Sequence, residues 1–313
     1  MPEQSSPTAC IEISLETESG FLVASIDPTA AAVRELTLGD SPLIQSYPEG
    51  EDAPFFAGHT LLPWPNRVAG GLWSFDGQEL SLSINDHEHR AALHGLLYSR
   101  VYDVTEVASS AVVLTTTLEP SEGYPFTLQV AVRYALEDSG LRVTYDVTNA
   151  GTGVAPFAAG AHPFLRAGFR DLADMELLSP VQSYLVTDST LIPAAEIDLE
   201  AGDALNLSEG RILSDITLDT AFRVSGDAQG AVTRLSSPSG HVTELWQDAA
   251  WGWVQIFLTR QFPAPEGALW ALAVEPMTSP PNALAPGDDL IMLAPAQTWS
   301  ASWGIRGSFA SRD

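Results

Sequence analysis

The chain has 313 residues, 45% of them hydrophobic, and its 40 acidic and 14 basic residues give a formal net charge of −26. This excess of negative charge excludes the basic surfaces through which proteins bind nucleic acid or anionic membranes. All 14 basic residues are arginines, so the chain has no lysine for a Schiff base, a phosphate-binding P-loop or a Ser–Lys dyad.

Taken in chain order, the sequence predicts many strands and few helices. Residues 30–36 and, later, residues 209–213 are compatible with a turn or two of helix. Elsewhere apolar and polar side chains alternate with a period of two, which indicates half-buried strands. The predicted strands cover residues 72–75, 80–84, 112–118, 127–136, 141–147, 232–235, 242–246, 253–258, 270–274 and 298–305.

The alternation is clearest in the two predicted strands on either side of the turn at residues 137–140. In the first of them, Leu128 and Val130 flank the polar Gln129. The 24 glycines and 22 prolines lie largely between the predicted strands, where turns use their special backbone angles. We therefore predict an all-β fold of antiparallel strands. Because no linker divides the chain, we expect one domain over residues 1–313.

The cellular location is inferred from two absences. The first 25 residues have no basic segment followed by an apolar run, and no later stretch approaches the roughly 18 consecutive apolar residues of a membrane helix. Cys10 is the single cysteine, so neither an intrachain disulfide nor a thiolate metal site can form. We expect a protein that is neither exported nor membrane-inserted, and the cytoplasm fits best.

Five short segments each place one ionisable residue among small, apolar or chain-stiffening neighbours, where a polar side chain is costly to bury. These residues are Arg67, His94, His162, Asp219 and Glu275. Glu275 follows the apolar run at residues 269–274, so loss of hydration is expected to raise its pKa above about 4.3. A carboxylate with a raised pKa is a better base, and the other four residues supply the remaining groups for acid–base work on a neutral polyol.

The same residues also have structural interpretations. Glu275 can simply pair with Arg67, and His162 can cap a backbone carbonyl. Three aromatic residues next to the candidate site residues are expected either to form the walls of a sugar pocket or to pack in the core. They are Trp64, Phe164 and Phe222.

Metal and cofactor chemistry has weak support in the sequence. His87 and His89 are a possible metal pair, although Asn85 and Asp86 favour an exposed loop there. The chain has no Gly-x-Ser-x-Gly elbow, no Gly-x-Gly-x-x-Gly loop and no His-Glu-x-x-His helix. We predict an enzyme that uses neither a metal nor a cofactor.

Taken together, the five segments resemble the aldose 1-epimerase (galactose mutarotase-like) family. The resemblance lies in their order: Asn66-Arg67, His94-Gly95, a mid-chain His162, Asp219 followed closely by Phe, and a late Glu275. With the strands before and after, it covers nearly the whole chain. It implies a large antiparallel β-sandwich that holds a sugar in an open cleft.

The resemblance also implies a role for each residue. Glu275 takes the proton of the anomeric hydroxyl while His162 protonates the ring oxygen, so that the ring opens and recloses as the other anomer. Arg67 and His94 hydrogen-bond near the ring oxygen, and Asp219 holds sugar hydroxyls. Asn66 positions Arg67 or contacts the sugar.

The substrate is less constrained than the proton chemistry. The His162 segment reads Ala-His-Pro-Phe-Leu where the galactose mutarotases have Asn-His-x-Tyr-Phe, so the pocket walls differ. An unphosphorylated hexose or pentose is the preferred substrate. A hexose 6-phosphate, bound by Arg90, Arg166 or Arg170, and a non-catalytic carbohydrate-binding role on the same fold remain as alternatives.

Overall fold

The computed structural model describes residues 9–309, and all its named strands pair in antiparallel fashion. The ends of the predicted domain, residues 1–8 and 310–313, lie outside the described residues, and the single domain stays a prediction. No helix in the described chain is long and apolar enough to cross a membrane. Within the same residues, the only helices are short 3-10 turns: η1 (Pro54–Phe56), η2 (Leu172–Asp174), η3 (Leu207–Glu209) and η4 (Leu213–Asp215).

The largest sheet has nine strands. Its order is β10 (Asp103–Ala108), β11 (Ala111–Leu118), β12 (Leu128–Glu137), β13 (Gly140–Asn149), β27 (Thr298–Phe309), β23 (His241–Gln247), β22 (Ala231–Ser236), β17 (Glu176–Leu178) and β20 (Arg211–Ile212). The hairpin predicted around residues 137–140 is confirmed as β12 and β13, with Leu136 opposite Leu141. The last strand of the described chain, β27, lies between β13 and β23, in the middle of this sheet.

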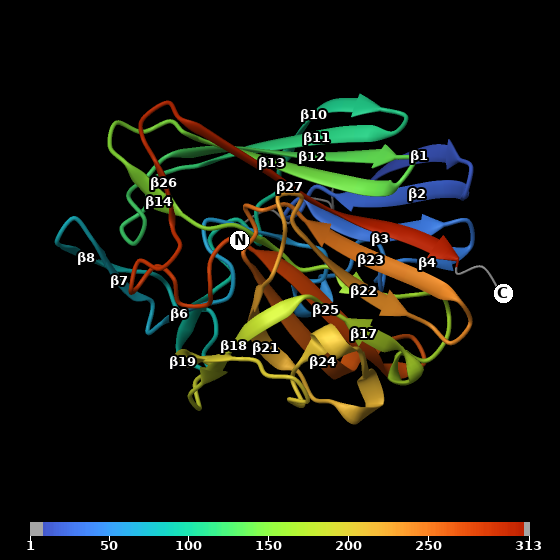
Figure 1. Cartoon of the computed structure of the whole chain (residues 1–313). Helices are drawn as coiled ribbons and strands as arrows, with labels where there is room; N and C mark the ends of the chain where they lie inside the picture. Colours follow the sequence, from blue (N-terminus) through green and yellow to red (C-terminus); the bar gives the residue numbers. More distant parts are fainter. Residues whose placement is uncertain (1–8, 310–313) are drawn as a thin grey trace.

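The second large sheet carries the candidate site. Its path is β19 (Pro193–Asp198), β18 (Val181–Thr187), β21 (Asp219–Val224), β24 (Trp253–Ala264), β25 (Gly267–Met277), β15 (Gly160–Ala161) and β5 (Thr60–Leu61), and β16 (Phe164–Leu165) pairs with β25. In Figure 1, strands β10 to β13 run across the top of the molecule and β18, β21 and β24 lie at the bottom.

Smaller sheets complete the fold. Near the N-terminus, four strands form one sheet in the order β1 (Ile11–Thr17), β2 (Gly20–Asp27), β3 (Ala32–Leu38) and β4 (Ser41–Pro42). Three two-stranded ribbons pair β14 (Ala155–Phe157) with β26 (Ile291–Leu293), β6 (Arg67–Ala69) with β9 (Ala91–Leu93), and β7 (Leu72–Phe75) with β8 (Gln78–Ser81).

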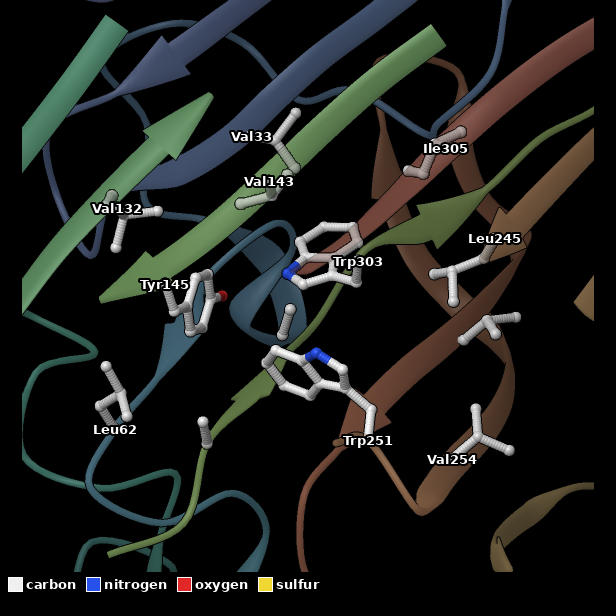
Figure 2. Close-up of a cluster of buried hydrophobic side chains, with 14 of the residues drawn as sticks. Val33, Leu62, Val132, Val143, Tyr145, Leu245, Trp251, Val254, Trp303 and Ile305 are labelled. Carbon is white, nitrogen blue, oxygen red and sulfur yellow. The ribbon is translucent and has the colours of Figure 1, made fainter. Parts of the chain in front are cut away.

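The core fills the space between the two large sheets, as expected of a β-sandwich. Figure 2 shows Trp303 of β27 and Tyr145 of β13 next to Trp251, which precedes β24, with Val254 of β24 on the far side of Trp251. The rings of Tyr145 and Trp251 pack edge to face, 5.5 Å apart. The predicted all-β sandwich is therefore confirmed.

Residues 30–36, which the sequence left compatible with a turn or two of helix, contain no helix. Ala32–Leu38 is strand β3, paired with β2, and Ala30 and Ala31 before it have positive φ angles of 55° and 44°. Alanine favours helix, but pairing with a neighbouring strand outweighs a preference of under 1 kcal/mol per residue. The second segment, residues 209–213, is not a helical turn either: η3 ends at Glu209, Arg211–Ile212 is strand β20, and η4 begins at Leu213.

Candidate active site

A pocket of about 270 Å³ opens on the face of the second large sheet that is turned away from the core. All six residues selected from the sequence line it, namely Asn66, Arg67, His94, His162, Asp219 and Glu275. The other lining residues are Phe55, Phe56, His89, Leu93, Leu191, Gln255 and Phe257. Groups that are up to 209 positions apart in sequence therefore converge on one cavity.

Three neighbouring strands form the floor of the pocket. Glu275 of β25 lies opposite Gln255 of β24, and Asp219 begins β21 opposite Phe257 of β24. Because successive side chains of a strand point to opposite faces, Val254 and Val274 turn into the core while Gln255 and Glu275 face the pocket. The apolar run before Glu275 is thus the core-packed part of the strand that presents it.

His162 lies between β15 and β16, beside the floor. Its backbone N–H donates to the carbonyl of His59 (3.0 Å), and its carbonyl accepts from the N–H of Gly58 (2.8 Å). The imidazole stacks on Phe164 with ring centroids 5.2 Å apart. Both backbone and ring of His162 are therefore fixed, which suits a residue that must meet a substrate at a defined atom.

The ribbon of β6 and β9 supplies the opposite wall, with Arg67 paired to Leu93. Asn66 and His94, at its mouth, both have positive φ angles, 55° and 62°. The next residue, Gly95, must be glycine because a Cβ there would lie 2.1 Å from the Leu62 carbonyl oxygen. The His94-Gly95 motif is thus a tight turn that presents an imidazole to the pocket.

The hydrogen bonds of this turn define which atoms remain for a ligand. Nδ1 of His94 accepts from the backbone N–H of Asn66 (3.2 Å), and burial lowers the pKa of His94 well below its usual range. The ring is therefore neutral, with its proton on Nε2 as a donor. The side-chain oxygen of Asn66 accepts from the N–H of Arg67 (2.9 Å), so Asn66 fixes the backbone of Arg67.

Glu275 and His162 form a contact pair at the bottom of the pocket. Oε1 of Glu275 lies 3.4 Å from Nε2 of His162, and the two residues are 2% and 4% exposed. Oε2 of Glu275 and Nδ1 of His162 are buried without any hydrogen-bond partner in residues 9–309. Six other buried polar atoms of the described residues also lack a partner, but only these two belong to residues that line the pocket, where a ligand can supply one.

Burial shifts the two groups of this pair in opposite directions. Loss of hydration, reinforced by the nearby Asp219, raises the pKa of Glu275 well above its usual value, and Arg67 opposes that rise only in part. Burial lowers the pKa of His162 to about 3. Both shifts favour the neutral forms, so the pair holds one proton over a wide pH range.

Asp219 and Gln255 form a second, polar pair. The amide of Gln255 donates to Oδ1 of Asp219 (2.7 Å), which leaves Oδ2 for another donor. Burial raises the pKa of Asp219, while Arg67 and the Gln255 amide act against the rise. This corner of the pocket offers acceptors to hydroxyl groups.

A sequence model of the aldose 1-epimerase family matches residues 15–306. The chain belongs to the aldose 1-epimerase family. It is 31% identical over 303 residues to YihR, an uncharacterized protein of Escherichia coli (strain K12), with 95% of this chain and 94% of that protein covered. It is 26% identical over 295 residues to the galactose mutarotase of Pongo abelii, covering 83% of this chain and 85% of that one.

Solved structures agree on the fold of this family member. An aldose epimerase homologue from C. elegans superposes with a TM-score of 0.84 at 19% identity, over 97% of this chain and all of the other. A galactose 1-epimerase from Lactobacillus acidophilus NCFM gives 0.80 at 19% identity, over 99% and 97% of the two chains. At this level of identity the likeness establishes the galactose mutarotase-like sandwich.

The structure decides between the two interpretations of the aromatic residues next to the site in this aldose 1-epimerase family member. Trp64, Phe164 and Phe222 are at most 2% exposed and do not line the pocket, so the core interpretation holds for them. Phe164 supports the His162 ring from behind. The walls come instead from Phe55, Phe56 and Phe257. In sequence, Phe55 and Phe56 lack a regular strand pattern that would have marked them.

Two polar pocket residues were also missed. Gln255 interrupts an otherwise apolar predicted strand, and that interruption was the available signal. His89 was considered only as half of a metal pair, but it contacts the carboxylate of Asp86 instead. The described residues contain no group of three His, Cys, Asp or Glu side chains placed to hold a metal ion. Arg67 pairs with Asp86 rather than with Glu275.

Proposed function

We propose that the protein is an aldose 1-epimerase that interconverts the α and β anomers of a neutral hexose or pentose. The observation that carries this proposal is the Glu275–His162 pair, buried at the pocket floor with one orphaned atom on each residue. The galactose mutarotases among its relatives support the same reaction class. Neither proton transfer requires a metal or a cofactor.

The proposed reaction moves two protons. Glu275 removes the proton of the anomeric hydroxyl at O1, and His162 delivers a proton to the ring oxygen O5. The C1–O5 bond breaks as the C1=O1 carbonyl forms, which gives the open-chain aldehyde. Rotation about C1–C2 presents the other face of the carbonyl, and the reverse transfers close the ring as the opposite anomer.

One shared proton satisfies this cycle. In the empty pocket desolvation favours the neutral carboxyl and neutral imidazole, with the proton on Glu275. A bound sugar adds hydroxyl dipoles, and the fixed charge of Arg67 favours the Glu275 carboxylate. Transfer of the proton to His162 then sets up the base and the acid without exchange with solvent.

The surrounding side chains are suited to hold the sugar. Nε of Arg67 is occupied by Asp86, while its two terminal nitrogens have no hydrogen-bond partner among the described residues, so both are available to ring or hydroxyl oxygens. Nε2 of His94 is a second donor. Asp219 and Gln255 face hydroxyl groups on the other side, and the Phe55, Phe56 and Phe257 rings cover the apolar C–H faces.

A neutral sugar fits this pocket better than a sugar phosphate. Among the described residues that line it, Arg67 alone is a permanent cation, and its charge is compensated by Asp86. None of Arg90, Arg166 and Arg170 lines the pocket. Arg166 donates instead to the side chain of Gln45 and to the carbonyl of Arg170. A dianionic phosphate would meet Asp219 without a dedicated cation.

The test follows anomeric interconversion of α-D-glucose, α-D-galactose and pentoses by NMR, after subtraction of the spontaneous rate. We expect Glu275→Gln and His162→Asn each to lower kcat by about 10²- to 10⁴-fold. Glu266→Gln, an exposed change at the turn between β24 and β25, is the matched control and should leave the rate unchanged. Full activity in Glu275→Gln would refute the mechanism. Sugar binding by a wild-type protein that catalyses no interconversion would favour the non-catalytic alternative.

A further inference from the structure

The turn at residues 86–91 contributes His89 to the pocket lining, and the mechanism above gives this histidine no role. Asp86 and Ala91 bridge through two backbone hydrogen bonds of 3.1 and 3.0 Å, and Gly70 donates to the carbonyl of Arg90 (2.9 Å). The side chain of Asn85 bonds both the N–H and the carbonyl of Leu93, which belongs to the pocket lining. The turn is therefore held against the ribbon that carries Arg67.

One carboxylate in this turn binds two pocket residues. Oδ2 of Asp86 accepts from Nε of Arg67 (2.8 Å) and lies 2.9 Å from Nδ1 of His89. Oδ1 of Asp86 accepts from the backbone N–H of His89 (3.1 Å). The three side chains are 14%, 9% and 21% exposed, for Arg67, Asp86 and His89 in turn. Asp86 thus fixes an arginine and a histidine that both face the same cavity.

The protonation of the cluster determines what His89 offers. Partial burial alone would raise the pKa of Asp86, but the hydrogen bonds from His89 and Arg67 outweigh it and lower that pKa. Asp86 is therefore ionised at neutral pH and can only accept, so Nδ1 of His89 carries a proton. Nε2 of His89 has no hydrogen-bond partner in residues 9–309 and is left for a ligand.

We propose that His89 contacts the substrate, with Nε2 hydrogen-bonded to one hydroxyl of the sugar, and that Asp86 is a positioning residue for His89 and Arg67 together. This inference rests on the proposed function, because it names a specificity-determining residue of the same site. It predicts that the enzyme discriminates between sugars at the hydroxyl that meets His89.

The charges around His89 favour a neutral hydroxyl as its partner. Asp86 contacts His89, and Arg67 and Asp219 are the charged groups nearby that act on this corner of the pocket. Arg67 and Asp86 compensate each other, and Asp219 adds negative charge on the far side. A neutral hydroxyl can accept from or donate to the imidazole in this setting, whereas an anionic group would be repelled by Asp219.

The experiment combines variants at position 89 with deoxy sugars. His89→Phe keeps a ring without nitrogens, and His89→Gln restores a polar group. For the best substrate we expect His89→Phe to raise KM roughly tenfold with kcat little changed, and His89→Gln to recover part of the loss. For the deoxy sugar that lacks the contacted hydroxyl, His89→Phe should have no further effect. Glu88→Gln, an exposed change in the same turn, is the control.

Asp86→Asn tests the positioning role. We expect it to raise KM more than His89→Phe does, because it disturbs both Arg67 and His89, and the double variant should be no worse than Asp86→Asn alone. Circular dichroism and Tm establish that each variant is folded. Should Asp86→Asn fail to fold, the deoxy-sugar series with His89→Phe still decides the proposal.

Two results would overturn the inference. One is an equal penalty of His89→Phe for the parent sugar and every deoxy sugar, which would indicate indirect support rather than contact. The other is a His89→Phe variant with wild-type KM. Binding to the Glu275→Gln protein, measured by calorimetry with the same sugars, separates these failures from a failure of the proposed function, because it needs no catalysis.

Discussion

The two faces of strands β24 and β25 are built on the same backbone but differ in almost every physical respect. On one face, Val254, Ile256 and Val274 pack into the sandwich core, in the same cluster as Trp251 and Trp303. On the other, Gln255 and Glu275 line the pocket. The difference is set by alternation alone, since neighbouring residues of one strand point in opposite directions.

Residues on the core face raise the free energy of unfolding, whereas the buried polar group on the pocket face lowers it. Side chains such as Ile256 and Val274 are fully buried and apolar, and each contributes about 1.5–3 kcal/mol through loss of contact with water. Glu275 is buried to nearly the same degree but leaves Oε2 without a partner. A buried acceptor without a partner costs about 1–3 kcal/mol, and a bound ligand that donates to it recovers that energy. We therefore expect substitutions on the pocket face to lower activity without lowering stability, and substitutions on the core face to lower stability without lowering activity.

The largest expected effect is the separation of activity from stability in Glu275→Gln. Its loss of activity should come without loss of stability. The raised pKa means that the folded protein keeps a proton that the unfolded chain releases above about pH 4.5, so wild-type stability falls as pH rises through this range. Urea titrations should show Glu275→Gln gaining on wild type by up to about 1.4 kcal/mol per pH unit. A pH-independent difference would contradict the assignment.

The opposite result, a loss of stability with activity retained, is expected for Ile256→Ala on the core face. Deleting this buried side chain should lower the free energy of unfolding by about 2–5 kcal/mol, through lost burial and the cavity left behind. Because Ile256 does not line the pocket, kcat and KM at a temperature where the variant remains folded should stay close to wild type. A large fall in kcat in the fully folded variant would show that the two faces are not independent.

The pH dependence of catalysis should be flat where an ordinary histidine would titrate. The cycle needs one proton on the Glu275–His162 pair, and the second proton binds only near the lowered His162 pKa of about 3. We therefore expect kcat/KM at pH 5 to lie within about twofold of its value at pH 7. Rates must be corrected for spontaneous mutarotation. An acid limb centred near pH 6.5 would mean that His162 is hydrated rather than buried.

The smallest effect is expected for Gln255→Ala, the neighbour of Glu275 on the pocket face. Removing the amide leaves Oδ1 of Asp219 without its donor and lets burial raise the Asp219 pKa further. We expect KM to rise roughly two- to tenfold with little change in kcat, measured on the best substrate. A fall in kcat as large as that of Glu275→Gln would place Gln255 in proton transfer instead.

Local patterns in the sequence pointed to five of the six proposed site residues, because each is an ionisable group in an apolar or turn-rich segment, and the family resemblance added Asn66. The strands at residues 127–136 and 253–258 were also visible, the first from its alternation and the second from its apolar run, but β1, β2, β18 and β21 were not predicted. The contacts that these residues make with distant segments could not be predicted. That His89 meets Asp86 and Arg67, or that Phe55 and not Phe222 walls the pocket, depends on register and loop path between distant segments. The strand at Ala32–Leu38 was missed for the same reason, as its pairing with β2 overrides local preference.

The central position of β27 constrains how the molecule is made. Residues 298–309 leave the ribosome after every other described strand, yet they join β13 to β23 in the middle of the nine-stranded sheet. Until that insertion, a nascent chain has two half-sheets with open edges at β13 and β23, and open edges invite pairing with other chains. Synthesis that stops before residue 298 should therefore yield aggregating fragments, and chaperone demand should peak just before β27 emerges.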